Sequence, residues 1–173
     1  TVLVFSSVLS SELSKGTLIN LLTKGLSRTA VIMGKFAAML TIWTASLATA
    51  FVTTWGYTVF LFSDDYSANL FSSVFCLWLF GVFILAVLLC SSTLAASSYG
   101  ALLLTGAAAV CLAILNIFPK AWKYNPLSLA GKNMELVTNS IMFSSLSYAI
   151  GVTVAAAIAL LAAAVLIFKR KQL

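Results

Sequence analysis

Long apolar runs separated by short polar stretches set the pattern of this chain. The runs extend from Phe36 to Phe62, from Leu70 to about Ala96, from Ala101 to Phe118 and from Ser140 to Phe168. A spanning helix needs about 20 residues, so the third run predicts a shorter span than the others. An earlier run, Thr1 to Ser11, is expected to be the cytosolic end of a span whose start precedes this sequence. The pattern predicts an all-α, polytopic membrane helix bundle with four complete spans.

Composition agrees with a membrane protein. Hydrophobic residues make up 62% of the chain and charged residues 8%, whereas a soluble domain contains about 25% charged residues. A formal net charge of +6 is also found in nucleic-acid-binding proteins. Here the basic residues gather in short loops and at the C-terminus, which is the positive-inside pattern of membrane proteins. We therefore expect a lipid bilayer as the partner of these charges, and no nucleic acid.

The basic residues also predict an orientation. The segment 12–35 carries four of them and the C-terminus carries Lys169, Arg170 and Lys171, so both regions are placed in the cytosol. Four complete spans between them lead back to the same side. The external segment 119–139 is basic as well, which conflicts with the rule. Its charged residues are Lys120, Lys123, Lys132 and Glu135.

The segment 12–35 predicts a short amphipathic helix between two breaks. Three leucines recur at helical spacing and fall on one face. Thr17 is a suitable N-cap, and Gly25 can end the helix in the left-handed conformation that glycine adopts readily. Two interpretations of this helix stay open: a helix resting on the membrane surface, and a docking helix for a partner protein. The leucines are Leu18, Leu21 and Leu22.

The same segment resembles the cytosolic stretch of type-two ABC transporter permeases. In that family an acidic residue ends one span, Gly-Thr-Leu opens a coupling helix, and Ser-Arg leads to Gly-Lys at the next span. A proline often precedes the Ser-Arg, and here Lys24-Gly25-Leu26 takes its place, which predicts a looser turn. The matching positions are Glu12, Gly16, Thr17, Leu18, Leu21, Leu22, Ser27, Arg28, Gly34 and Lys35.

The resemblance implies that residues 1–173 form one transmembrane permease domain. It implies short helices in the external segment 119–139, where the family's Asn-Pro appears as Asn125-Pro126. It also implies separate ABC ATPase subunits that bind ATP and magnesium, and a second permease subunit, identical or different. The expected location is a bacterial plasma (inner) membrane, with the C-terminus in the cytosol. The residues expected to contact the ATPase are Glu12, Gly16, Thr17, Leu18, Leu21, Leu22 and Arg28.

Chemistry that the sequence lacks narrows the function further. Gly34-Lys35 is followed by Phe36, so this glycine-lysine pair is not a P-loop for ATP. The chain has no histidine and no Asp or Glu within a predicted span, which argues against an intramembrane protease. Without an ionisable residue at mid-membrane, a proton- or ion-coupled carrier is also disfavoured. We expect no catalytic, cofactor-binding or metal site in this chain.

Three further features have more than one interpretation. Six hydroxyl side chains of the first complete span are expected to bond within the helix or to a neighbour rather than to form a polar translocation surface. Ser147, Gly151 and Ala155 form a small-residue ridge that predicts a helix-packing face. Asp64 and Asp65 predict a solvated turn rather than a cation site, and three single cysteines are expected to be buried. The hydroxyl residues are Thr41, Thr44, Ser46, Thr49, Thr53 and Thr54, and the cysteines are Cys76, Cys90 and Cys111.

Together with the resemblance, these observations predict that the chain is the permease subunit of an ATP-driven ABC transporter that acts as an exporter. The alternative is a membrane scaffold or sensor subunit that docks a cytosolic protein on the same basic segment and moves nothing. An integral-membrane enzyme is disfavoured because the catalytic groups are missing.

Overall fold

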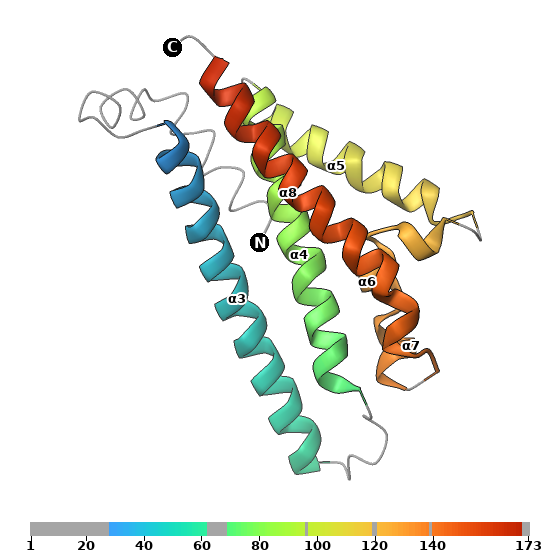
Figure 1. Ribbon diagram of the computed structural model, residues 1–173. Helices are drawn as coiled ribbons and strands as arrows, with labels where there is room; N and C mark the ends of the chain where they lie inside the picture. The colour runs from blue at the N-terminus through green and yellow to red at the C-terminus, as the bar shows by residue number, and fades with distance from the viewer. Residues whose placement is uncertain (1–27, 62–68, 96, 119–120, 139, 171–173) are drawn as a thin grey trace. The chain divides into compact units, whose positions relative to one another are not determined.

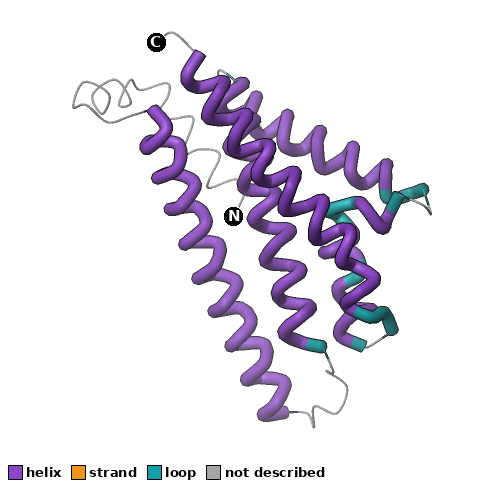
Figure 2. The backbone as a smooth tube through the Cα atoms, in the orientation of Figure 1, coloured by secondary structure: helices purple, strands orange, loops and turns teal. Residues whose placement is uncertain are grey.

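The computed structural model describes residues 28–61, 69–95, 97–118, 121–138 and 140–170. In these residues the backbone is helical apart from turns and short connections, and it forms no strand (Figure 2). The predicted all-helical class is therefore confirmed for this part of the chain.

Four long helices carry the apolar runs (Figure 1). At 1.5 Å per residue, the 18 residues of α5 extend about 27 Å, slightly less than the ~30 Å hydrocarbon core of a bilayer. The other three helices are long and apolar enough to cross a membrane. These helices indicate a membrane-embedded protein, and the count of four spans stays a prediction. The bounds are α3 (Arg28–Leu61), α4 (Leu70–Leu94), α5 (Ser98–Leu115) and α8 (Ser147–Arg170).

Short helices occupy the segment between α5 and α8, as the resemblance implies for residues 119–139. Asn125 is extended, with ψ of 123°, because a following proline disfavours the helical region for the residue before it. This break at Asn125-Pro126 separates the first short helix from the second. Whether these helices dip into the membrane stays a prediction. The short helices are η1 (Trp122–Tyr124), α6 (Ser128–Gly131), α7 (Asn133–Val137) and η2 (Phe143–Leu146).

The chain divides into two compact units. The core of the first unit is made of apolar faces at helical spacing. On α3 the buried residues Ile32, Phe36 and Met39 recur every three or four positions, which explains why the helix includes residues before the apolar run at Phe36. The described parts of the first unit are residues 28–41, 84–95, 97–111 and 156–170.

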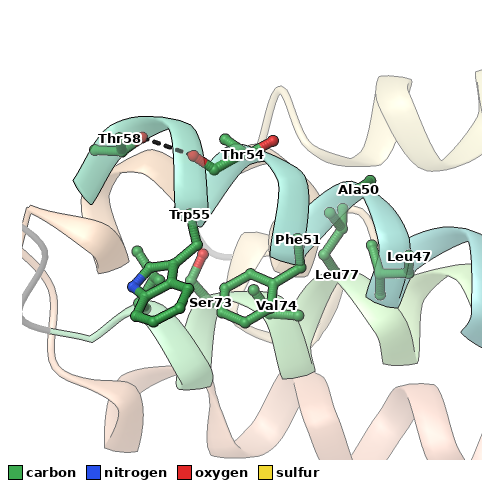
Figure 3. Close-up of a pocket in the computed structure, with 10 residues that line it drawn as sticks. Leu47, Ala50, Phe51, Thr54, Trp55, Thr58, Ser73, Val74 and Leu77 are labelled. Atoms are coloured by element: carbon green, nitrogen blue, oxygen red, sulfur yellow. Dashed lines mark hydrogen bonds between the residues drawn. The ribbon is translucent and has the colours of Figure 1, made fainter. Parts of the chain in front are cut away.

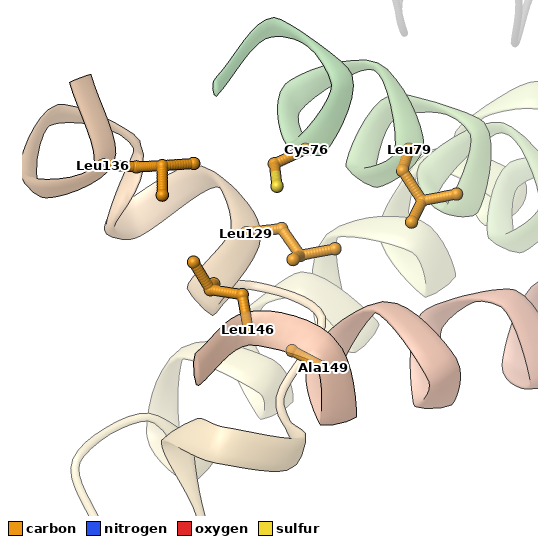
Figure 4. Close-up of a cluster of buried hydrophobic side chains, with 6 residues drawn as sticks. All are labelled: Cys76, Leu79, Leu129, Leu136, Leu146 and Ala149. Carbon is orange, nitrogen blue, oxygen red and sulfur yellow. The ribbon is translucent and has the colours of Figure 1, made fainter. Parts of the chain in front are cut away.

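The second unit contains the features that bear on function. Its described parts are residues 42–61, 69–83, 112–118, 121–138 and 140–155. A buried apolar cluster joins the short helices to α4 and α8 (Figure 4). Its members come from five different helices, so this packing fixes the position of the short helices against the two long ones. The buried members are Cys76, Leu79, Leu129, Leu136, Leu146 and Ala149.

Candidate functional site

The residues predicted to couple to an ATPase lie almost entirely outside the described part of the chain. The exception is Arg28, whose backbone begins α3. Asp64 and Asp65 are outside the described residues as well. The coupling helix and its contacts therefore stay predictions. The predicted contact residues outside the described part are Glu12, Gly16, Thr17, Leu18, Leu21 and Leu22.

The predicted ridge on α8 does not pack against the described residues of this chain. Ser147, Gly151 and Ala155 are exposed, and a Cβ added at Gly151 would meet no atom within 4 Å. In the second unit, α8 packs through a different face that includes the buried residues Ala149 and Thr153. A packing role for the ridge is therefore left to a partner subunit and stays a prediction.

Two tryptophans fasten α3 to α4 within the second unit. Trp43 Nε1 donates a hydrogen bond to the Trp78 carbonyl oxygen at 3.2 Å, and Trp78 Nε1 donates to Thr44 Oγ1 at 3.1 Å. Gly81 leaves room for the first indole, because a Cβ at this position would overlap the Trp43 ring. The close approach of a ring to the helix backbone thus requires glycine. We call Trp43, Thr44, Trp78 and Gly81 the tryptophan clamp.

Beyond the clamp, α3 and α4 enclose a groove of about 280 Å³, the α3–α4 groove. Figure 3 shows Trp55 and Phe51 projecting from α3 toward α4, where Ser73 and Val74 lie. Among the residues that the structure describes, no charged side chain lines the groove. Its volume is close to the lower end of the range for small-molecule pockets, about 300–1,000 Å³.

Two hydroxyl groups in the wall of this groove, those of Thr58 and Ser73, are already hydrogen-bonded. The Thr58 hydroxyl donates to the Thr54 carbonyl oxygen at 2.9 Å, as Figure 3 shows. The Ser73 hydroxyl donates to Asn133 Oδ1 at 2.6 Å. With these donors engaged, the wall presents mainly apolar surface to an occupant.

Other hydroxyls of α3 are also bonded within their own helix. Thr41, Thr49 and Thr53 each donate to the carbonyl oxygen four residues earlier, at 2.8–2.9 Å. Thr44 accepts the bond from the Trp78 indole. The expectation that hydroxyls bond within the helix or to a neighbour is therefore confirmed for these four residues.

Asn125 connects the end of α5 to the short helices. Its Nδ2 donates at 2.7 Å to the carbonyl oxygen of Leu112 in the last turn of α5, which also accepts from the Asn116 amide at 3.1 Å. Its Oδ1 accepts from the Leu127 amide at 3.0 Å, across Pro126. The side chain is buried. The Asn-Pro pair, quoted above only for its resemblance, thus has a physical role in joining the last turn of α5 to the residue before α6.

A reciprocal pair of hydrogen bonds fastens α7 to the first turn of α4. Asn133 Nδ2 donates to the Ser73 carbonyl oxygen at 2.7 Å, while the Ser73 hydroxyl donates to Asn133 Oδ1. Beside this pair, Lys132 lies 4.2 Å from the centre of the Trp122 ring and 3.2 Å from Glu135 Oε2. One basic charge of the segment 119–139 is therefore paired with an acidic side chain.

The described residues contain no group of three His, Cys, Asp or Glu side chains that could hold a metal ion. Cys76 and Cys90 are buried, as predicted, but Cys111 is exposed on α5. The prediction of burial is wrong for Cys111, because this residue lies on the exposed face of α5. Sequence reasoning also missed the clamp, the groove and the role of Asn133, since none of them has a signal in local spacing.

This geometry defines the chain as a helical, membrane-embedded protein. Comparison with models of known families, with characterised proteins and with solved structures found no match.

Proposed function

We propose that this chain is the permease subunit of an ATP-driven transporter of the type-two ABC class, acting in export. Two permease subunits would pair in a bacterial plasma membrane, and two separate ATPases would bind on the cytosolic side. The observation that carries the proposal is the run of matched residues from Glu12 to Lys35, whose last part forms the start of the long apolar helix α3.

Two other observations support it. First, the four acidic residues of the chain lie at positions 12, 64, 65 and 135, outside the long helices α3, α4, α5 and α8. Ion coupling through an intramembrane carboxylate is therefore disfavoured, and energy would come from a partner. Second, short helices precede the last long helix, at the place where the resemblance implies them.

The tryptophan clamp offers a route for movement. When the ATPase dimer closes on ATP, it would push on residues 16–23, which precede α3 in the chain. Because α3 is one continuous helix from Arg28 to Leu61, a tilt at its start would displace Trp43. The bonds of Trp43 and Trp78 would then draw α4 along and change the pathway across the membrane.

Purification of the tagged chain from its native membranes in mild detergent tests this proposal. We expect a P-loop ATPase in stoichiometric amount, identified by mass spectrometry, and ATP hydrolysis by the preparation. Absence of a stoichiometric ATPase would reject the transporter. The alternative function, a scaffold or sensor subunit, predicts a bound cytosolic protein but no solute whose addition stimulates ATP hydrolysis.

A further inference from the structure

We propose that the α3–α4 groove binds one acyl chain of a bilayer phospholipid. The groove belongs to helices that are long and apolar enough to cross a membrane. Its surroundings in a membrane are therefore lipid tails or another protein rather than water. The inference depends on membrane embedding and not on the proposed transport function.

The length of the groove matches one leaflet. On α3 its lining extends from Leu47 to Thr58, which is about 16 Å along the helix at 1.5 Å per residue. Half of a ~30 Å hydrocarbon core is about 15 Å. An extended acyl chain that lies along the groove would therefore cover its whole length.

The polarity of the lining also matches a lipid. At the end near the α3–α4 connection the wall contains Trp55, Thr58 and Ser73, each with a polar group, together with Leu70. At the opposite end it contains Leu47, Ala50 and Leu77, all aliphatic. Tryptophan is enriched where lipid head groups meet the hydrocarbon core. A phospholipid placed with its ester groups beside Trp55 and its terminal methyl beside Leu77 meets matching polarity at both ends.

The groove is open to such a lipid along one side. Trp55 is 49% exposed, and Ala50 and Thr54 are exposed as well. The chain would enter sideways from the leaflet and would not have to pass a constriction. Under the predicted orientation this is the outer leaflet, since the α3–α4 connection is placed outside the cell.

Depth-resolved photolabelling tests the proposal. The full chain, with any subunits that co-purify, is placed in phosphatidylethanolamine vesicles that contain a trace of the same lipid with a diazirine. The diazirine sits either next to the ester or next to the terminal methyl of one acyl chain. Labelled positions are then mapped by mass spectrometry.

We expect the ester-proximal probe to label the groove around Trp55 and Ser73, and the terminal probe to label it around Leu47 and Leu77. Labelling at these positions should exceed, several-fold, labelling at Ile42 and Val52, which are exposed apolar residues on other faces of α3. Equal labelling of groove and faces would overturn the proposal. Absence of label from the groove would also overturn it, because a second subunit or an apolar solute would then occupy the site.

A matched pair of variants adds a second readout. Ala50→Phe places a ring in the groove, whereas Ala45→Phe places the same ring on the opposite face of α3, where Ala45 is exposed. We expect groove labelling to fall several-fold in the first variant and to be unchanged in the second. Equal labelling of both would contradict the site. If Ala50→Phe fails to fold, the map of the unmodified chain still decides the question.

Discussion

At the scale of single residues, the second unit depends on a few positions where only one side chain fits. The Trp43 ring lies against the α4 backbone at Gly81, and its Nε1 is held by the Trp78 carbonyl. The indole therefore cannot move away from a new methyl group without breaking a hydrogen bond. Among the glycines of the described residues, Gly81 is therefore the one where an added Cβ would overlap most with a neighbouring side chain.

We predict that Gly81→Ala lowers stability by about 1–3 kcal/mol, the usual cost of overpacking. Gly56→Ala on α3 is the matched control, since a Cβ there meets no atom within 4 Å. Thermal unfolding in detergent, followed by tryptophan fluorescence, measures both. In a Trp43→Ala background the cost of Gly81→Ala should disappear, because contacting residues couple. An unchanged cost in that background would disprove the clamp.

Asn133 gives a second prediction at this scale. Asn133→Ala removes both bonds to Ser73 and leaves the buried Ser73 hydroxyl without its partner. Such a loss costs about 1–3 kcal/mol, so the unfolding midpoint should fall. Asn116→Ala, at an exposed position after α5, should leave the midpoint unchanged. Equal midpoints for the two variants would show that the Asn133 pair does not stabilise the second unit.

At the scale of elements, the apolar runs predicted the long helices well and their ends less well. The runs from Leu70 and Ala101 correspond to α4 and α5 within a few residues. By contrast, the run from Phe36 to Phe62 misses the first part of α3, which already includes Arg28, because its buried face continues before the run through Ile32. Apolar runs do not show which side of a spanning helix packs, because lipid and protein both accept the same residues.

The candidate site was predictable only in part for the same reason. Asn125-Pro126 was recognised from its resemblance, and the Asn125 side chain proved to join the last turn of α5 to Leu127, the residue before α6. The clamp and the groove bring together residues of α3 and α4 that are far apart in sequence, such as Trp43 and Trp78. No local spacing encodes such a pairing, so sequence periodicity alone did not find it.

The ridge on α8 yields a prediction for this scale. Because Gly151 meets no atom of the chain within 4 Å, Gly151→Leu should leave the folding of an isolated subunit unchanged. If the ridge packs against a second permease subunit, the same variant should weaken pairing by the 1–3 kcal/mol typical of overpacking. Val152→Leu, about 100° around the helix, should be mild. Analytical ultracentrifugation in detergent measures the fraction of paired subunits for each variant. Unchanged pairing in Gly151→Leu would exclude the ridge as an interface.

At the scale of the whole molecule, the basic residues predict the orientation. Lys171 is expected in the cytosol, and Lys123 on the external side. Lys132 pairs with Glu135, but the positive-inside rule counts Lys and Arg rather than net charge, so the basic residues of the segment 119–139 still conflict with it. The number of basic residues in the segment 12–35 and at the C-terminus still favours a cytosolic location for both.

Cysteine labelling checks this orientation. In a variant without the native cysteines, an impermeant reagent added to intact cells should label Lys123→Cys and Asp65→Cys. It should not label Lys171→Cys or Ser14→Cys until the cells are opened. Labelling of Lys171→Cys in intact cells would reverse the predicted topology and place the coupling segment on the wrong side for an ATPase.

The central claim is that the apolar face of Leu18, Leu21 and Leu22 docks an ATPase, and ATPase retention by Leu21→Asp tests it most directly. A charge buried without a partner costs several kcal/mol, which lowers affinity by orders of magnitude. Asn20→Asp adds the same charge on the opposite face of the predicted helix and serves as the control. We expect the ATPase to be lost from purified Leu21→Asp and retained in Asn20→Asp, with both chains inserted in the membrane. Retention of the ATPase and of ATP-driven transport in Leu21→Asp would contradict the coupling assignment and the transporter proposal with it.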